Sequence, residues 1–105
     1  MSLQKVPMIR SNAIRKAAEG EACTICNRND GTTVFCHLNE SWAGKGLGMK
    51  ASDLAGMFLC RVHHEIYDGR AISVPRVEDW IYWRAMYRTW ARLIEKGIIT
   101  IKGAT

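Results

Sequence analysis

Two short stretches decide the fold of this chain: Cys-Thr-Ile-Cys at residues 23–26 and Cys-Arg-Val-His-His at residues 60–64. The first offers two thiolates three residues apart, and the second offers Cys60 and His63 at the same spacing. Each pair can hold a metal ion from one turn of chain, and thiolate with imidazole is a donor set that tetrahedral zinc prefers. The spacing therefore predicts a structural zinc ion bound by Cys23, Cys26, Cys60 and His63.

Length and composition limit the number of domains, the cellular compartment and the kind of partner that we expect. The 105 residues suit one domain, so we expect residues 1–105 to form a single domain with a marginal core that a bound zinc ion would stabilise. No stretch approaches the ~18 apolar residues of a membrane span, and the start lacks a secretory signal pattern, so we expect a cytoplasmic protein with no membrane contact. In that reducing compartment the four cysteines favour metal binding over disulfides. The net charge of +5 is compatible with a nucleic-acid partner without establishing one.

The pattern around these clusters predicts an α+β fold. Residues 32–38, Thr-Thr-Val-Phe-Cys-His-Leu, are rich in β-branched and aromatic side chains and predict a strand. Alternation along it places Cys36 in the core and His37 on the opposite face. The other expected elements, in chain order, are a helix over 12–18 with Ser11 as its N-cap, a loop over 39–53, a strand over 55–59, a helix from 63 to 67, a long helix over 75–96 and a strand over 98–102.

The long C-terminal helix carries two distinct faces. Its large apolar residues recur every three or four positions and predict one stripe packed on the rest of the domain: Trp80, Trp83, Tyr87, Trp90 and Ile94. A platform on which nucleic-acid bases stack is the alternative interpretation of the same stripe. Arg84, Arg88 and Arg92 recur every four residues on a different face.

A second set of metal-binding side chains follows the zinc pattern. His64 and Asp68 lie four residues apart, so on a helix both reach one face and can share a divalent ion. Since neighbouring helical residues project about 100° apart, His63 can serve the zinc while His64 faces a separate site. His37 on the preceding strand is placed to lie opposite that ion. Hydrolysis of a phosphodiester needs a base and a cation, so these residues indicate a metal-dependent nuclease.

Three stretches also carry a family resemblance: Ala-Ile-Arg-Lys-Ala-Ala-Glu-Gly-Glu-Ala-Cys at 13–23, Phe-Cys-His-Leu at 35–38, and Cys-Arg-Val-His-His-Glu-Ile-Tyr-Asp at 60–68. They are similar to the HNH, or ββα-metal, endonucleases. Most specifically they resemble a family of small proteins, classed as nucleases, that lambdoid phages and prophages encode. The resemblance implies a zinc-stabilised ββα-metal core of treble-clef type, with a short helix before it and a long packing helix after it.

The resemblance also implies roles for single residues. His37 matches the general base, and His64 and Asp68 match ligands of a catalytic Mg²⁺ or Mn²⁺ ion. Asp53 stands at the position of the middle Asn, where it keeps an orienting role but adds a charge. Cys36 stands where many members carry a metal-binding acid.

The sequence thus predicts a divalent-metal-dependent DNA endonuclease of phage recombination type. A non-catalytic zinc module that binds DNA or a protein remains the alternative, because Cys36 and Asp53 depart from the HNH pattern, as does His63, which replaces a zinc-binding cysteine. Four basic residues near the candidate site are expected to contact DNA phosphates: Lys45, Lys50, Arg61 and Arg70.

Overall fold

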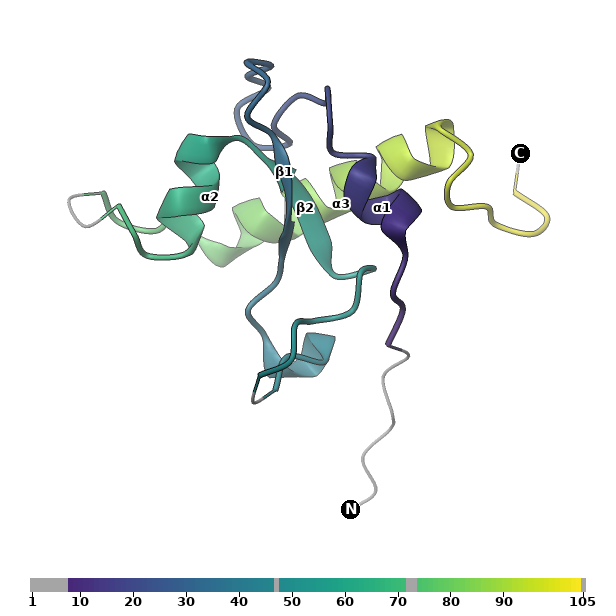
Figure 1. The fold of residues 1–105 in the computed structure, drawn as a ribbon, viewed down its shortest axis with the longest axis horizontal. Helices are drawn as coiled ribbons and strands as arrows, with labels where there is room; N and C mark the ends of the chain where they lie inside the picture. The colour runs from purple at the N-terminus through teal and green to yellow at the C-terminus, as the bar shows by residue number, and fades with distance from the viewer. Residues whose placement is uncertain (1–7, 47, 72–73, 105) are drawn as a thin grey trace.

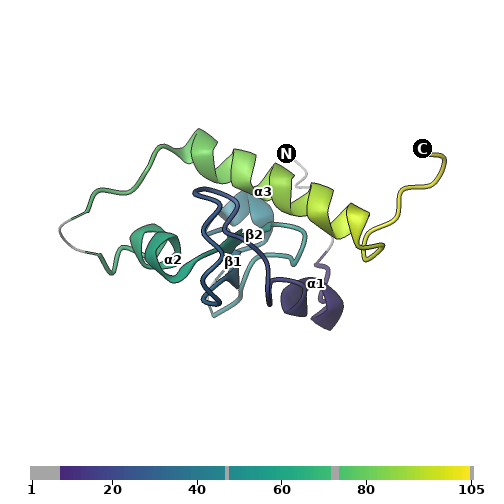
Figure 2. The ribbon, with the colours of Figure 1, turned by 90° about the horizontal axis from the view of Figure 1, so that it is seen from above.

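A computed structural model describes residues 8–46, 48–71 and 74–104 of the chain. Its elements are α1 (Asn12–Lys16), β1 (Val34–His37), the short 3₁₀ helix η1 (Ser41–Ala43), β2 (Gly56–Leu59), α2 (Arg61–Tyr67) and α3 (Asp79–Glu95). The two strands pair in antiparallel fashion, with Val34 opposite Leu59 and His37 opposite Gly56. Figure 1 shows this hairpin in the centre with α2 on one side and α1 on the other, and Figure 2 shows α3 lying across it. The predicted α+β class is confirmed at this level.

The outer edge of β2 is closed by hydrogen bonds from two directions. The backbone N–H of Phe58 donates to Oγ1 of the buried Thr89 on α3 at 3.0 Å, and the Phe58 carbonyl accepts from the N–H and hydroxyl of Thr24. Arg88 and Arg92 of α3 donate to two backbone carbonyls of the segment around the first cysteine pair, at 3.0 and 2.5 Å. An open strand edge is thereby covered, and the cysteine pair is fixed against the hairpin.

The prediction that the aromatic stripe of α3 packs in the core is wrong. The buried residues of α3 are instead Tyr82, Ala85, Thr89 and Leu93. The predicted stripe lies on the surface, with exposed fractions of 50% at Trp80, 48% at Trp83 and 68% at Tyr87. Small residues at positions 85 and 89 let the helix backbone approach β2 closely enough for the Thr89 hydrogen bond, and a tryptophan at either position would hold the two apart.

The predicted boundaries fail at both ends of the long helix. Instead of beginning at Pro75, α3 begins at Asp79, because residues 75–78 are not helical and the N-cap Glu78 has an extended backbone. There the Arg76 guanidinium lies over the rings of Tyr67 and Tyr82, 4.8 and 5.2 Å from their centroids. After α3 the predicted strand over 98–102 is absent from the described residues, since this segment closes the helix end with two backbone bonds to one carbonyl, that of Leu93.

The shorter elements lie close to where the sequence places them. Ser11 caps α1 through a hydrogen bond to the Ile14 N–H, as predicted, although the helix ends at Lys16, two residues before the expected end at 18. Both strands are shorter than expected, and α2 begins two residues before His63. Within the described part of the chain, no helix combines the length and apolar character needed to cross a bilayer.

Candidate metal centres and catalytic pocket

Four side chains meet where the first cysteine pair faces the start of α2. The Sγ atoms of Cys26 and Cys60 lie 3.8 Å apart, and His63 Nδ1 lies 3.5 Å from Cys60 Sγ and 3.7 Å from Cys23 Sγ. Zinc bonds of about 2.3 Å to sulfur and 2.05 Å to nitrogen give tetrahedral edges of about 3.8 Å for S···S and 3.6 Å for S···N. The donor set and its spacing therefore fit one tetrahedral zinc ion. We call these four residues, Cys23, Cys26, Cys60 and His63, the zinc cluster.

Local backbone structure builds the zinc cluster from both sides. Asn27 adopts a left-handed conformation (φ 63°) and donates its N–H to the Cys23 carbonyl, so the chain turns sharply after the cysteine pair. Cys60 is the N-cap of α2, which places His63 one turn along on the same side. Burial, followed by the charge of Arg28, lowers the pKa of His63, so the imidazole is held in the neutral form that binds a metal. Burial raises the pKa of Cys60 to about 11, so zinc binding releases its proton.

On the open side of the hairpin, His37 at the end of β1 is held by Asp53. The His37 Nε2 lies 2.7 Å from Asp53 Oδ1, and the Asp53 carboxylate, only 1% exposed, also accepts from the Ser11 N–H and from Arg15. Burial raises the pKa of this carboxyl, but hydrogen bonds from His37 and Ser11 and the charge of Arg15 outweigh burial and hold it below its usual value. Asp53 is therefore an anion that orients the imidazole, and Nδ1 is the ring nitrogen that makes no contact with this carboxylate.

The packing beneath His37 depends on a missing side chain. Gly56 lies opposite His37 in the hairpin, and a Cβ atom there would come within 2.2 Å of the Phe35 ring. The Phe35 ring can therefore lie over the β2 backbone, with its centroid 5.0 Å from that of His37 in an edge-on arrangement. The imidazole is thus fixed by an aromatic ring as well as by a carboxylate.

A second group of metal-binding side chains adjoins His37. Cys36 of β1, His64 of α2 and Asp68 at the end of α2 each present one ligand atom within 4.8 Å of the others. His64 Nε2 lies 3.1 Å from Asp68 Oδ2, which confirms that the two side chains reach the same point in space. Cys36 is buried, as predicted, and burial together with the Asp68 charge raises the pKa of its thiol to about 12.

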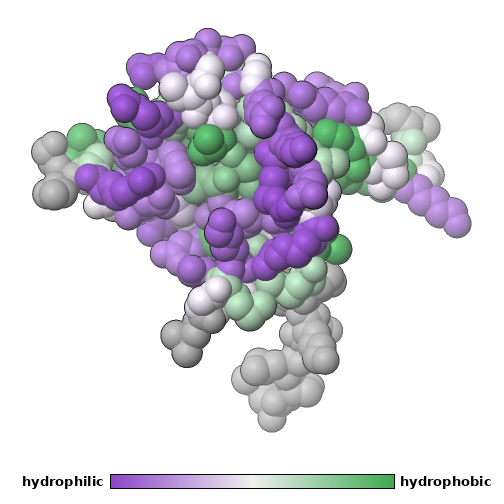
Figure 3. Space-filling model, viewed as in Figure 1, coloured by the Kyte–Doolittle hydropathy of each residue, from purple (hydrophilic) through white to green (hydrophobic). Residues whose placement is uncertain are grey.

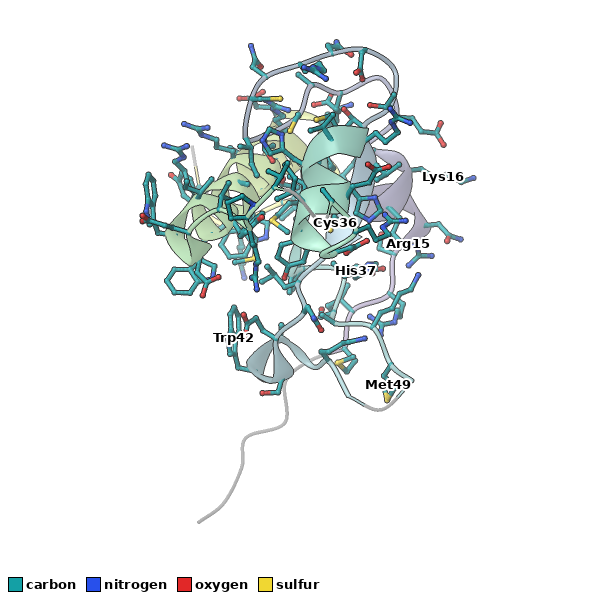
Figure 4. All side chains as sticks on the ribbon, turned by 90° about the vertical axis from the view of Figure 1, so that its left-hand side faces the viewer. Arg15, Lys16, Cys36, His37, Trp42 and Met49 are labelled. Atoms are coloured by element: carbon teal, nitrogen blue, oxygen red, sulfur yellow. The ribbon has the colours of Figure 1, made fainter. Side chains whose placement is uncertain are left out.

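Three adjoining pockets of about 260, 280 and 280 Å³ surround these residues, and His37 and Lys50 line all three. We call them together the catalytic pocket, after the role that the sequence interpretation predicts for His37. Figure 4 shows Arg15, Cys36 and His37 gathered beside α2, with Met49 and Trp42 farther away on the segment between the strands. Figure 3 shows that the face turned toward the viewer in Figure 1 is hydrophobic in its centre and hydrophilic around it. Among the residues that line the catalytic pocket are four basic side chains, those of Arg10, Arg15, Lys45 and Lys50.

The chain matches a known protein family over most of its length. Residues 12–98 match the family described as "Putative nuclease YbcO", a match that spans the zinc cluster, the hairpin, α2 and α3. The chain belongs to the YbcO family. A solved structure described as "Structure of a putative bacteriophage protein from Escherichia coli str. K-12 substr. MG1655" is 26% identical, with a TM-score of 0.58 over 81% of this chain and 100% of that chain. No curated protein matches the chain.

Of the four residues predicted to contact DNA, two line the catalytic pocket of this chain and two do not. Lys45 and Lys50 line the catalytic pocket, whereas Arg61 and Arg70 do not line its three parts. Arg70 is instead paired with Asp68 at 3.1 Å, and Arg61 is an exposed residue at the start of α2.

The sequence interpretation missed two basic residues of the pocket: Arg10, just before α1, and Arg15, on it. Arg10 donates to the carbonyls of Ala51 and Lys50 at 2.7 and 2.8 Å, which fixes it beside the pocket. The only signal available in the sequence was their basic charge close to the Ser11 cap. That charge has no periodicity that would assign it to a site about 40 residues away along the chain.

Proposed function

We propose that this YbcO-family chain is a single-domain, divalent-metal-dependent DNA endonuclease of the HNH, or ββα-metal, type, acting in phage recombination. The observation that carries the proposal is the position of His37. It is held by the ionised Asp53 and opens into the same pocket as His64 and Asp68. The order of hairpin, zinc cluster and α2 supports the ββα-metal assignment, since α2 starts at the zinc cluster and carries both proposed ion ligands.

In the proposed reaction, His37 removes a proton from water through Nδ1 while Asp53 stabilises the imidazolium that results. The activated water attacks the phosphorus in line with the departing 3′-oxygen. His64 and Asp68 would hold a divalent ion, for which the resemblance implies Mg²⁺ or Mn²⁺. Such an ion, when bound, supplies positive charge that offsets the charge developing on phosphate and leaving group.

The basic side chains of the catalytic pocket are proposed to bind the DNA backbone. Lys50 lines every part of the pocket, and Lys45, Arg10 and Arg15 line one part each. Lys50→Ala should weaken binding to all DNA sequences alike. It should also reduce the magnitude of the slope of log affinity against log salt concentration by about one, because one phosphate contact is lost. The matched control is Lys102→Ala, which removes an exposed lysine distant in sequence from the pocket and should leave the slope nearly unchanged.

The central test is cleavage of supercoiled, linear and branched DNA by zinc-loaded protein with added divalent ions. His37→Ala should reduce cleavage by roughly 10²–10⁴-fold, the usual effect of losing a general base. Its zinc content should stay the same, because His37 lies outside the zinc cluster. His64→Ala should raise the ion concentration needed for cleavage, whereas the control Glu65→Gln, on the same helix, should not.

Two outcomes would count against the proposal. Absence of cleavage by zinc-loaded wild-type protein on every DNA form and with every common divalent ion would favour a non-catalytic zinc module. Full activity of the His37→Ala protein would reject His37 as the base while leaving the nuclease assignment in place.

A further inference from the structure

We propose that Cys36 is a third protein ligand of the ion in the catalytic pocket, and that this site selects a thiophilic transition-metal ion, such as Zn²⁺ or Co²⁺, over Mg²⁺ and Mn²⁺. This inference rests on the proposed function only for the role of the ion. The metal site itself can be measured without DNA.

The geometry places the Cys36 sulfur at the ion position. Its Sγ, one ring nitrogen of His64 and one carboxylate oxygen of Asp68 all lie within 4.8 Å of one another. The His64 and Asp68 ligand atoms lie 3.1 Å apart, close to the roughly 3.4 Å edge that nitrogen and oxygen occupy on a tetrahedral zinc ion. Three residues that share one point, drawn from the strand and from the helix, form a site that neither element supplies alone.

The Cys36 thiol also lacks a short hydrogen bond to the described residues of the protein. Only 3% of the residue is exposed, and the hydrogen bond recorded for its thiol is a long one of 3.8 Å to the carbonyl of His37. The thiol packs in the core cluster on one side, while the same residue lines the catalytic pocket. A sulfur in that position is available to a cation that enters from the pocket.

The donor chemistry then decides which cation the site favours. Mg²⁺ requires hard oxygen ligands in near-octahedral geometry and gains little from a thiolate. Thiolate and imidazole ligands favour Zn²⁺ and similar transition metals. A carboxylate also binds zinc, and it brings the set to the three protein ligands that catalytic zinc sites have, with a position left open. Once a bound ion has displaced the Cys36 thiol proton, the thiolate and the Asp68 carboxylate together carry two negative charges, which matches a divalent cation.

The alternative for Cys36 is an ordinary buried thiol. In that case the chain binds one transition-metal ion, at the zinc cluster, and His64 with Asp68 is left as a weak two-ligand site. The two interpretations differ in metal stoichiometry, in the spectrum of a bound ion, and in the effect of replacing one sulfur by oxygen.

The test is a titration of Co²⁺ into the full chain already loaded with one zinc ion, without DNA, while free zinc is monitored. We expect one further equivalent of cobalt to bind without zinc release and to give the intense absorption of a thiolate bonded to cobalt. Cys36→Ser should remove that absorption and weaken cobalt binding by at least about 10–100-fold, as disruption of a metal site commonly does. It should retain the first zinc ion, because Cys36 is not in the zinc cluster.

A second variant makes the ion preference itself testable. Cys36→Asp restores an oxygen ligand, and we expect it to raise the affinity for Mn²⁺ and to lower that for Co²⁺. Equal cobalt affinity in wild type and Cys36→Ser, or a cobalt spectrum without a thiolate band, would overturn the inference. Thiolate-bound cobalt in a protein that cleaves no DNA would sustain this inference and reject the proposed function. Mg²⁺-dependent cleavage that is unchanged in Cys36→Ser would support the proposed function and reject this inference.

Discussion

Replacing Asp53 by Asn tests the contact that holds His37 in the catalytic pocket. The Asp53 side chain is 1% exposed and its two oxygens accept from His37 Nε2, from the Ser11 N–H at 2.7 Å and from Arg15. An asparagine offers one acceptor oxygen and an NH₂ group, so the NH₂ faces either the Ser11 and Arg15 donors or His37 Nε2, which must then accept. The substitution therefore removes a charge, and it either leaves a buried donor without a partner or moves the His37 proton to Nδ1, the wrong tautomer for the proposed base.

The expected loss in the free energy of unfolding can be calculated from these contacts. A hydrogen bond to a charged acceptor contributes about 1.5–3 kcal/mol, and removing one partner of a buried ion pair costs about 3–5 kcal/mol. We expect a loss of about 3 kcal/mol, because the exposed side of Arg15 can still reach water. At about 2.1 cal/mol/K per residue, a chain of this length has an unfolding entropy near 220 cal/mol/K, so Tm should fall by about 14 °C.

The loss should also depend on pH in a defined direction. The pKa of Asp53 in the folded protein lies below its usual value, so in acid the unfolded chain binds more protons and stability falls with falling pH. The stabilisation is complete above the unfolded-state pKa of about 3.9 and is lost as pH falls through the lower folded-state pKa. The deficit of Asp53→Asn should thus be greatest at neutral pH and shrink below about pH 4.

Thermal denaturation followed by circular dichroism from pH 7 down to the acid range measures both effects. Asp30→Asn is the control, because Asp30 also accepts hydrogen bonds and has a lowered pKa but is exposed, so its Tm at pH 7 should stay close to that of wild type. An Asp53→Asn protein that melts within a few degrees of wild type, with the same acid profile, would refute the structural role argued for Asp53. The same variant should lose DNA cleavage, since His37 is no longer oriented.

Thr89→Val should lower the free energy of unfolding by about 1–3 kcal/mol, because the buried Phe58 N–H loses its acceptor; chemical denaturation measures this, and an equal loss in the exposed control Thr100→Val would argue against it. Removal of zinc by a chelator should abolish the cooperative thermal transition, since structural zinc contributes about 10–16 kcal/mol in small zinc domains, more than most domains have in reserve. The tryptophans of α3 should be quenched readily by iodide, because they are 36–50% exposed, and protected tryptophans would mean that another chain covers them.

Features that depend on spacing within one element could be predicted from the sequence. The zinc cluster is two pairs at the same short spacing, the Ser11 cap is a local hydrogen bond, and His64 and Asp68 share a helix face by periodicity. The spacing within each zinc-binding pair, the cap and the shared helix face each require only that one local segment forms. Their placement in the structure agrees with the expectation, whereas their chemical roles are open to the experiments above.

Features that depend on how elements pack could not be predicted in the same way. The periodicity of α3 revealed an apolar stripe but not whether that stripe faces inward. The inward face is chosen by small residues and by Arg88 and Arg92, which bind backbone carbonyls near the first cysteine pair. The contact of Arg15 with Asp53 joins residues 38 positions apart, and no local pattern records it.

The two candidate metal sites are joined through neighbouring residues, and this constrains how the pocket can be tested. His63 belongs to the zinc cluster and His64 to the second group, so a zinc ion bound at the cluster would fix the rotation of α2 and with it the direction of His64. On β1, Cys36 and His37 are likewise neighbours in sequence, and both line the part of the pocket that also contains His64 and Asp68. Loss of zinc would therefore displace His64 and Asp68 even though both residues are intact. A protein purified without zinc would lack activity for a structural reason, so inactivity bears on the proposed function only when the zinc content of the same sample has been measured.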